Sequence, residues 1–198
     1  MPKLMALAGA AAVLWGVSLL WQMADMLFAA HMAQHLLLIA LAAPLLVLGG
    51  MEIKASPLAG WSLFVTVFLF WHWPAAFQWA ARGALTELLE LGSILAAAVC
   101  FWSVVLGTGR LNDGARALMV MTAAVLTDLP GVVMLFAPRA ICVMPHENAG
   151  RFGLTPLSDQ QLAGLLMWVP ANLVFFGIAT FLFARWIGAV HSHPLVTS

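Results

Sequence analysis

Residues 26–49 read MLFAAHMAQHLLLIALAAPLLVLG, an apolar run that carries two histidines and one proline. A helix rises about 1.5 Å per residue, so about 20 apolar residues are enough to cross the hydrocarbon core of a bilayer. This run therefore predicts a transmembrane helix.

The rest of the chain is apolar in the same way. Of its 198 residues, 64% are hydrophobic and 8% are charged, whereas soluble domains have about 45–50% and about 25%. The mean hydropathy is +1.01. The sequence predicts an all-α, polytopic integral membrane bundle, formed by residues 1–198 as a single transmembrane domain, with about six spans, several of them kinked by Pro44, Pro74, Pro130 or Pro170. The expected spans are residues 4–21, 26–49, 61–79, 85–106, 115–136 and 162–187.

Charge and length exclude several classes of protein. The formal net charge is zero, and no basic tail suggests a nucleic-acid partner. The six spans leave no stretch for a separate soluble catalytic domain. The lipid bilayer is thus the partner that composition alone indicates.

Lysine and arginine set the expected orientation. With six spans, one side of the membrane holds Lys3, Lys54, Arg110, Arg116 and Arg185, and the other holds Arg82, Arg139 and Arg151. The bias predicts that both termini are cytoplasmic. The first run follows Lys3 as a signal peptide would, but its apolar core is long and no small-x-small cleavage site follows it, so we expect a retained span.

Ionisable side chains gather in the outer half of the expected bundle. Depth counted along each span places there His31, His35, His72, Glu87, Glu90, Asp128 and Asp159. Such groups are costly in a membrane and usually face the bundle interior or a water-filled cavity. They either satisfy one another by hydrogen bonds or line a functional cavity that opens outward, and the whole set favours the cavity.

His31 and His35 form the sharpest local motif. Residues at i and i+4 lie on one face of a helix, about 5–6 Å apart at Cβ, so the two imidazoles can share a metal ion. The glutamate that follows the first histidine in zinc proteases is replaced by Met32. Imidazole with thioether suits copper, and especially Cu(I). The alternative is structural, with one ring bonded to the backbone and the other packed.

Further soft donors lie in the same half. Met134 belongs to the fifth span, and Cys142, Met144 and His146 alternate in an outer loop, where an extended strand would turn them to one side. An ordinary loop is the alternative. No Cys-x-x-Cys is present, which argues against a thiol–disulfide metal carrier.

Several blocks of sequence together resemble a known family. His31-Met32-x-x-His35-Leu-Leu-Leu runs on to Ala43-Pro44-Leu45-Leu46-x-Leu48-Gly49; Trp71-His72-x-Pro74 and the run from Asp159-Gln160-Gln161 to Met167-Trp168-Val169-Pro170 follow in order. The set resembles the CtaG-type cytochrome c oxidase assembly factors. The resemblance implies a multi-pass protein of the bacterial inner membrane that helps copper reach a haem-copper oxidase. Oxidase subunits and other copper chaperones would be its partners, and His31, His35, His72 and Asp159 its carried-over positions.

One segment departs from that family. The family's fourth span opens with a histidine-rich stretch around an acidic residue, whereas residues 85–91 here read LTELLEL. This chain therefore either has fewer ligands or uses Glu90 instead.

Three functions stay open. The leading one is a non-enzymatic assembly factor that binds or passes copper at the outer face. A b-type haem subunit, with His31 or His35 and His72 as axial ligands, is the second, and an accessory oxidase subunit without metal is the third. An intramembrane hydrolase is disfavoured because no nucleophile–base pair is present.

Overall fold

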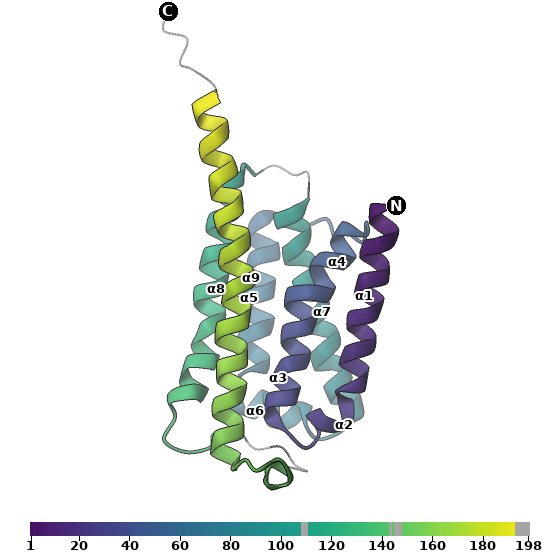
Figure 1. The fold of residues 1–198 in the computed structure, drawn as a ribbon, viewed down its shortest axis with the longest axis vertical. Helices are drawn as coiled ribbons and strands as arrows, with labels where there is room; N and C mark the ends of the chain where they lie inside the picture. Colours follow the sequence, from purple (N-terminus) through teal and green to yellow (C-terminus); the bar gives the residue numbers. More distant parts are fainter. Residues whose placement is uncertain (108–110, 143, 145–147, 193–198) are drawn as a thin grey trace, which may run out of the picture.

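The computed structural model describes residues 1–107, 111–142, 144 and 148–192, and in these ranges every regular element is helical (Figure 1). In chain order the elements are α1 (Pro2–Leu19), α2 (Trp21–Ala24), α3 (Phe28–Leu37), the π-helical turn η1 (Leu38–Ala42), α4 (Ala43–Leu48), α5 (Pro57–Trp71), α6 (Pro74–Ala80), α7 (Ala84–Leu106), α8 (Asp113–Phe136), the 3-10 turn η2 (Ala149–Phe152) and α9 (Pro156–Ser192).

Within the described ranges, five helical stretches are long and apolar enough to cross a membrane, and α5 with α6 makes a sixth if the bent pair counts as one span. The five are α1, α3 through α4, α7, α8 and α9. The predicted polytopic helical bundle is confirmed, and the chain is a multi-pass membrane protein.

The expected third span, residues 61–79, is not one straight helix. α5 ends at Trp71, α6 starts at Pro74, and their axes differ by 78°. A residue before proline is pushed out of the helical region, and Trp73 accordingly adopts φ −73° and ψ 131°. His72 lies at this bend.

The expected span 26–49 is interrupted in a different way. The π-turn η1 ends at Ala42, two residues before Pro44, whose ring lacks the N–H that would close a helical turn. Trp102 Nε1 donates to the carbonyl oxygen of Ile39 within η1, at 2.8 Å. The tryptophan on α7 thus satisfies a backbone group that the membrane could not.

The last helix begins before the expected residue 162. Thr155 Oγ1 accepts from the Ser158 amide at 3.1 Å, and Ser158 Oγ accepts from the Thr155 amide at 2.7 Å. This reciprocal cap, with Pro156 at the first helical position, starts α9 at Pro156.

α8 and α9 pack along each other at close range. A Cβ added to Gly164 on α9 would lie 2.6 Å from the carbonyl oxygen of Gly131 on α8. Small residues allow such approach in membrane bundles. The Asn172 side-chain amide donates to both carboxylate oxygens of Asp128, at 3.1 and 2.9 Å, and joins the same two helices.

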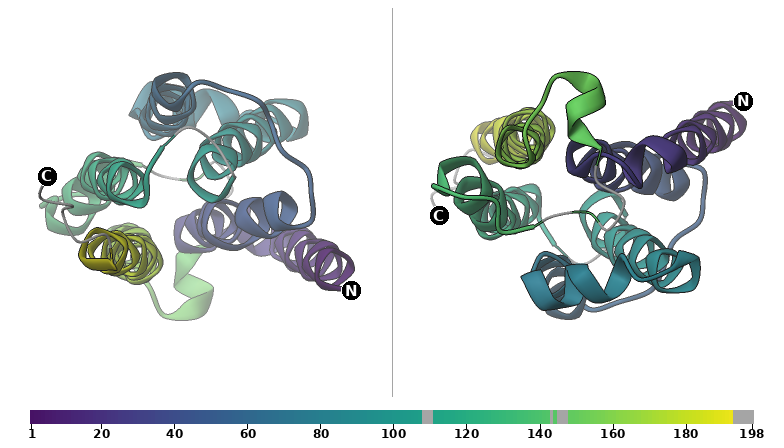
Figure 2. Two further views of the ribbon diagram at one scale, coloured as in Figure 1. Left: turned by 90° about the horizontal axis from the view of Figure 1, so that it is seen from above. Right: turned by 90° about the horizontal axis from the view of Figure 1, so that it is seen from below.

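Seen along the bundle, the α8–α9 pair occupies one side and α1 the edge of the other, with α3, α4 and α7 between them (Figure 2). The N-terminus and the far end of α9 lie at one end of the bundle, and α2, α6 and the start of α9 lie at the other (Figure 1). We call the latter the α2–α6 end.

Candidate metal centre

The site is built on α3, which carries His31 and His35 one turn apart. Their ring centroids are 4.7 Å apart, and the two residues are 2% and 1% exposed. The i, i+4 spacing turns both rings to the same face, as the sequence predicts.

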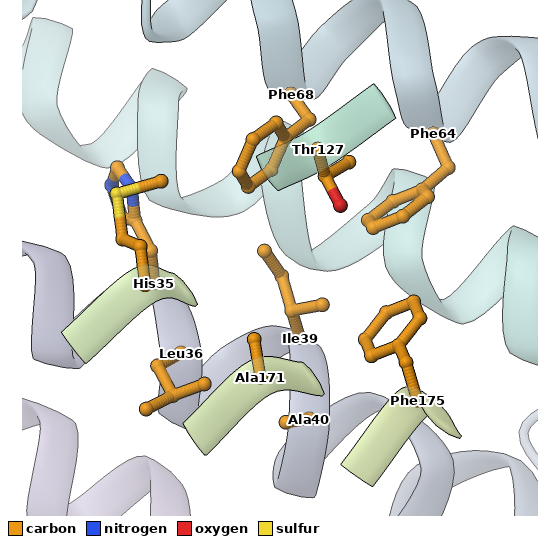
Figure 3. A pocket seen from close by; sticks show the side chains of 10 residues that line it. His35, Leu36, Ile39, Ala40, Phe64, Phe68, Thr127, Ala171 and Phe175 are labelled. Atoms are coloured by element: carbon orange, nitrogen blue, oxygen red, sulfur yellow. The ribbon is translucent and has the colours of Figure 1, made fainter. Parts of the chain in front are cut away.

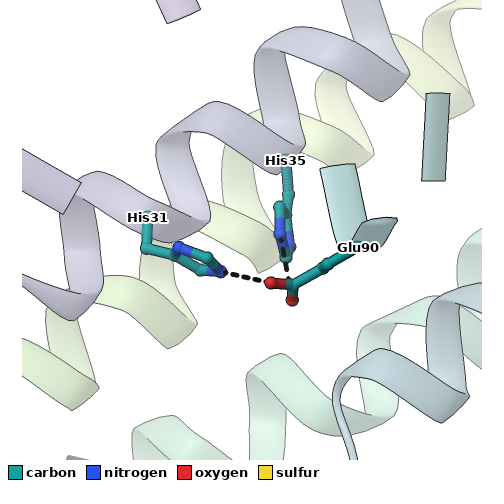
Figure 4. Close-up of side chains that lie close together, drawn as sticks. All are labelled: His31, His35 and Glu90. Atoms are coloured by element: carbon teal, nitrogen blue, oxygen red, sulfur yellow. Dashed lines mark ion pairs between the residues drawn. The ribbon is translucent and has the colours of Figure 1, made fainter. Parts of the chain in front are cut away.

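Glu90 on α7 completes the group (Figure 4). Its Oε2 lies 3.3 Å from His31 Nε2, and its Oε1 lies 3.4 Å from His35 Nε2. Glu90 is fully buried. One ligand atom from each of the three residues lies within 4.8 Å of the others, and within the described residues this is the one group of three histidine, cysteine or acidic side chains that is placed to hold a metal.

These contacts are not hydrogen bonds. Both nitrogens of each imidazole and both Glu90 oxygens lack a hydrogen-bond partner among the described residues, although buried polar groups are nearly always paired. Two ligands at about 2.05 Å from a tetrahedral ion are themselves about 3.3 Å apart. The two histidine–glutamate separations match this value, so the spacing suits a shared metal ion as well as it suits direct ion pairs between the imidazoles and Glu90.

His72 lies next to this group without joining it. Its ring centroid is 5.3 Å from that of His35. Its Nδ1 donates to the Phe68 carbonyl at 2.6 Å, which leaves Nε2 buried without a partner. A hydrogen bond of this kind fixes the tautomer in which Nε2 can be a ligand. In this tautomer the buried Nε2 of His72 carries a lone pair, as a metal ligand requires.

Asp159, which the sequence suggests as a metal ligand, makes two hydrogen bonds to backbone amides in the structure. Its two oxygens accept from the backbone amides of Phe28 and Ala29, at 2.7 and 3.0 Å. These are the first amides of α3, which have no partner within their helix. Asp159 thus anchors the start of the histidine-bearing helix to α9. Asp128, paired with Asn172, likewise does not join His31, His35 and Glu90.

The expected soft donors are buried in the main apolar core, which contains Met32, Met134, Cys142 and Met144. Met134 and Cys142 line a groove of about 740 Å³ together with His72, whereas Met144 lines a different cavity with His31. Burial raises the pKa of the Cys142 thiol to about 11. His146 lies outside the described residues.

Two glutamines that the sequence analysis did not single out connect the segments around the site. Gln34 is fully buried and donates to the Val17 carbonyl at 3.0 Å, which joins α3 to α1. Gln160 donates to the Met134 carbonyl at 3.1 Å and accepts from the Cys142 amide at 3.0 Å. A glutamine side chain in an apolar helix usually makes a hydrogen bond to a neighbouring helix. This rule would have identified Gln34 and Gln160 from the sequence.

The space beside His35 is small (Figure 3). A cavity of about 30 Å³ lies between α3, α5, α8 and α9, and His35 and Thr127 are the polar side chains on its wall. Such a volume holds about one water molecule. It offers no room for a large organic cofactor, for which pockets measure about 300–1,000 Å³.

Comparison with protein families identifies the chain's relatives. The family model of the cytochrome c oxidase caa3 assembly factor, Caa3_CtaG, matches residues 50–189, most of the chain. The chain belongs to the Caa3_CtaG family. This confirms the resemblance seen in the sequence. No curated protein and no solved structure matches the chain.

The Caa3_CtaG match covers the bend at His72 and the helix that carries Glu90. It begins after α3, so His31 and His35 precede the matched region. The contribution of these two histidines to the site therefore rests on the geometry described above.

Proposed function

We propose that this Caa3_CtaG protein binds one copper ion at His31, His35 and Glu90 and passes it to a haem-copper oxidase during assembly. The observation that carries the proposal is the buried group itself, in which two imidazoles and one carboxylate lie at ligand spacing without hydrogen bonds. The family supports the assembly role.

Charge favours Cu(I) at this site. Glu90 contributes one negative charge, so a monovalent ion gives a neutral buried site, whereas a divalent ion leaves an uncompensated positive charge. Imidazole suits copper, whereas carboxylates suit harder ions such as Mg²⁺, Ca²⁺ and Mn²⁺. Met32, buried beside His31 on α3, is a candidate additional soft donor.

Transfer fits the site better than catalysis does. Glu90 faces both imidazoles and is used as a ligand, so it is not free to act as the base of a hydrolytic metal site. Non-covalent haem held between His35 and His72 is less well supported, because their ring centroids lie only 5.3 Å apart. A metal-free accessory role would leave Glu90 as the ion-pair partner of both imidazoles and would give no use to the ring nitrogens that make no hydrogen bond among the described residues.

We further propose that the protein lies in the bacterial inner membrane with both termini cytoplasmic. The lysine and arginine bias supports this orientation. It places the α2–α6 end on the outer, periplasmic side, which His31 approaches more closely than His35 does.

The test replaces His31 and His35 together by alanine in cells that depend on the client oxidase. The expected result is normal amounts of the membrane protein but an oxidase with reduced copper content and activity. Glu90→Gln, which keeps the side-chain volume, should act in the same direction. His191→Ala is the matched control, since His191 is exposed on the opposite end of α9. A fully metallated oxidase in the double variant would contradict the proposal.

A further inference from the structure

We call His31, His35 and Glu90 the metal group. A cavity of about 470 Å³ leads from the α2–α6 end of the bundle to His31 of this group. It is lined, among others, by Asp25, Met26, His31, Arg82, Glu87 and Met144. We call this cavity the vestibule. Its lining residues come mainly from the segment that joins α1 to α3 and from the turn that joins α6 to α7.

The vestibule wall combines negative charge with soft donors. The carboxylates of Asp25 and Glu87 outnumber the single guanidinium of Arg82, and two thioethers, Met26 and Met144, share the wall. A concave surface with an excess of one charge raises the local concentration of the opposite ion. The chemistry that fits this wall is a small, soft cation.

His31 forms the inner end of the vestibule. It is 2% exposed, and neither of its ring nitrogens has a hydrogen-bond partner among the described residues. Because Glu90 lies 3.3 Å from its Nε2, an ion that reaches His31 has reached the metal group. The vestibule thus connects the end of the bundle with the buried ligands.

Glu87 is placed between these two regions. It is half-buried, lies three residues before Glu90 on α7, and is close enough to His31, Asp25 and Glu90 to interact with them electrostatically. On one helix, residues three apart lie on neighbouring positions of the same face. An ion held by Glu87 therefore has the buried group as its next set of ligands.

We propose that the vestibule is the loading route of the copper site, and that Glu87 is its first, transient ligand. The inference rests on the proposed function. Cu(I) keeps its oxidation state throughout: its bond to a Glu87 oxygen breaks as bonds to His31 and Glu90 form, and no electron is transferred. Asp25 attracts the ion by charge, and Arg82 opposes it.

The experiment measures loading of the detergent-purified full chain with Cu(I), added as its cationic acetonitrile complex without oxygen. Samples are mixed rapidly, quenched with a strong chelator, desalted, and analysed for retained copper. Glu87→Gln should slow loading roughly 3- to 10-fold at low salt, with a smaller difference at high salt. Arg82→Gln should speed it. With saturating Cu(I), both variants should reach the copper stoichiometry of the wild type, because His31, His35 and Glu90 are unchanged.

Glu52→Gln is the control, because Glu52 is exposed in a separate pocket at the opposite end of the bundle. Its loading rate should not change. Normal equilibrium binding with an unchanged rate in Glu87→Gln would overturn the loading route alone. A wild-type protein that retains no copper would overturn the proposed function, and the route with it.

Discussion

At the scale of single residues, the buried and half-buried carboxylates of this protein have different roles. Their positions along the spans do not reveal which role each one has. Glu90 faces two imidazoles, Asp159 caps a helix, and Asp128 pairs with an asparagine. All three come from the same expected half of the bundle. The side chain or backbone group next to each carboxylate determines whether it is a candidate ligand or a structural residue.

Removal of the Asp159 carboxylate should weaken the metal site from a distance. Asp159→Ala leaves the Phe28 and Ala29 amides unpaired at the start of α3. Loss of a helix cap costs about 1–2 kcal/mol, so thermal unfolding in detergent should begin at a lower temperature and copper retention should fall. Asp113→Ala should change stability by at most about 1 kcal/mol, because its closer arginine partner, Arg185, is 58% exposed and the other, Arg116, lies 3.8 Å away. Equal losses in the two variants would contradict the anchoring role.

Cys142 should react slowly with thiol reagents despite lying outside the long helices. It is 5% exposed, and its pKa is raised from 9.0 to about 11 by burial. Since the thiolate is the nucleophile, its fraction near pH 8 should be about 100-fold smaller than that of an ordinary thiol, and alkylation should speed up about tenfold per pH unit below pH 11. Alkylation by iodoacetamide followed by mass spectrometry measures this. Rapid, pH-independent labelling of the folded protein would contradict the burial.

The sequence predicted part of the site at this scale. Helical spacing was enough to place His31 and His35 on one face, and depth was enough to bring Glu90 near them. It was not enough to choose Glu90 over Asp128 or Asp159, because that choice depends on how each helix is rotated about its axis. The rotation of each helix is set by contacts with its neighbours, such as the hydrogen bond from Trp102 to Ile39. The sequence of one helix alone does not reveal these contacts.

At the scale of elements, the structure is held by a few close helix contacts and by breaks at prolines. The sequence predicted the existence and order of the spans. It also predicted kinks at the prolines, but not the 78° angle within residues 61–79 or the π-turn before Pro44. Pro170 sits inside α9 without breaking it, so proline alone does not determine where a membrane helix ends. The neighbours that satisfy the freed backbone groups make the difference.

The α8–α9 contact gives a matched test on one helix. Gly164→Ala places a Cβ 2.6 Å from the Gly131 carbonyl oxygen and 2.9 Å from the Leu135 amide nitrogen, both of which are backbone atoms. The helices must separate, and we expect a loss of about 1–3 kcal/mol. Gly177→Ala on α9 meets nothing within 4 Å and should be neutral or slightly stabilising. Thermal unfolding of both variants decides, and a stable Gly164→Ala protein would contradict the close contact.

At the scale of the whole molecule, the arrangement places a buried ligand group near one end of a membrane bundle and joins it to that end by a cavity. The opposite end carries the N-terminus and the far end of α9 (Figure 1). This polarity suits a protein that takes up an ion on one side of a membrane and releases it on the same side.

The proposed orientation is tested with a cysteine at Gly150, which is exposed at the α2–α6 end and has open space around its Cβ position. In intact spheroplasts, a membrane-impermeant thiol reagent should label Gly150→Cys and leave Lys54→Cys unlabelled. The buried native cysteines give the background. The reverse pattern would place the termini outside the cytoplasm and invert the orientation.

The central claim is that His31, His35 and Glu90 hold copper together, and X-ray absorption at the copper edge tests it most directly. The purified protein is loaded with Cu(I), and its spectrum is compared with that of the His31→Ala/His35→Ala variant. The wild-type protein should bind about one copper per chain, with scattering from two imidazole rings and an oxygen at about 2.0–2.1 Å, and the variant should lose the imidazole signal. Stoichiometric copper with imidazole scattering that survives in the variant, or no stoichiometric copper in the wild type, would contradict it.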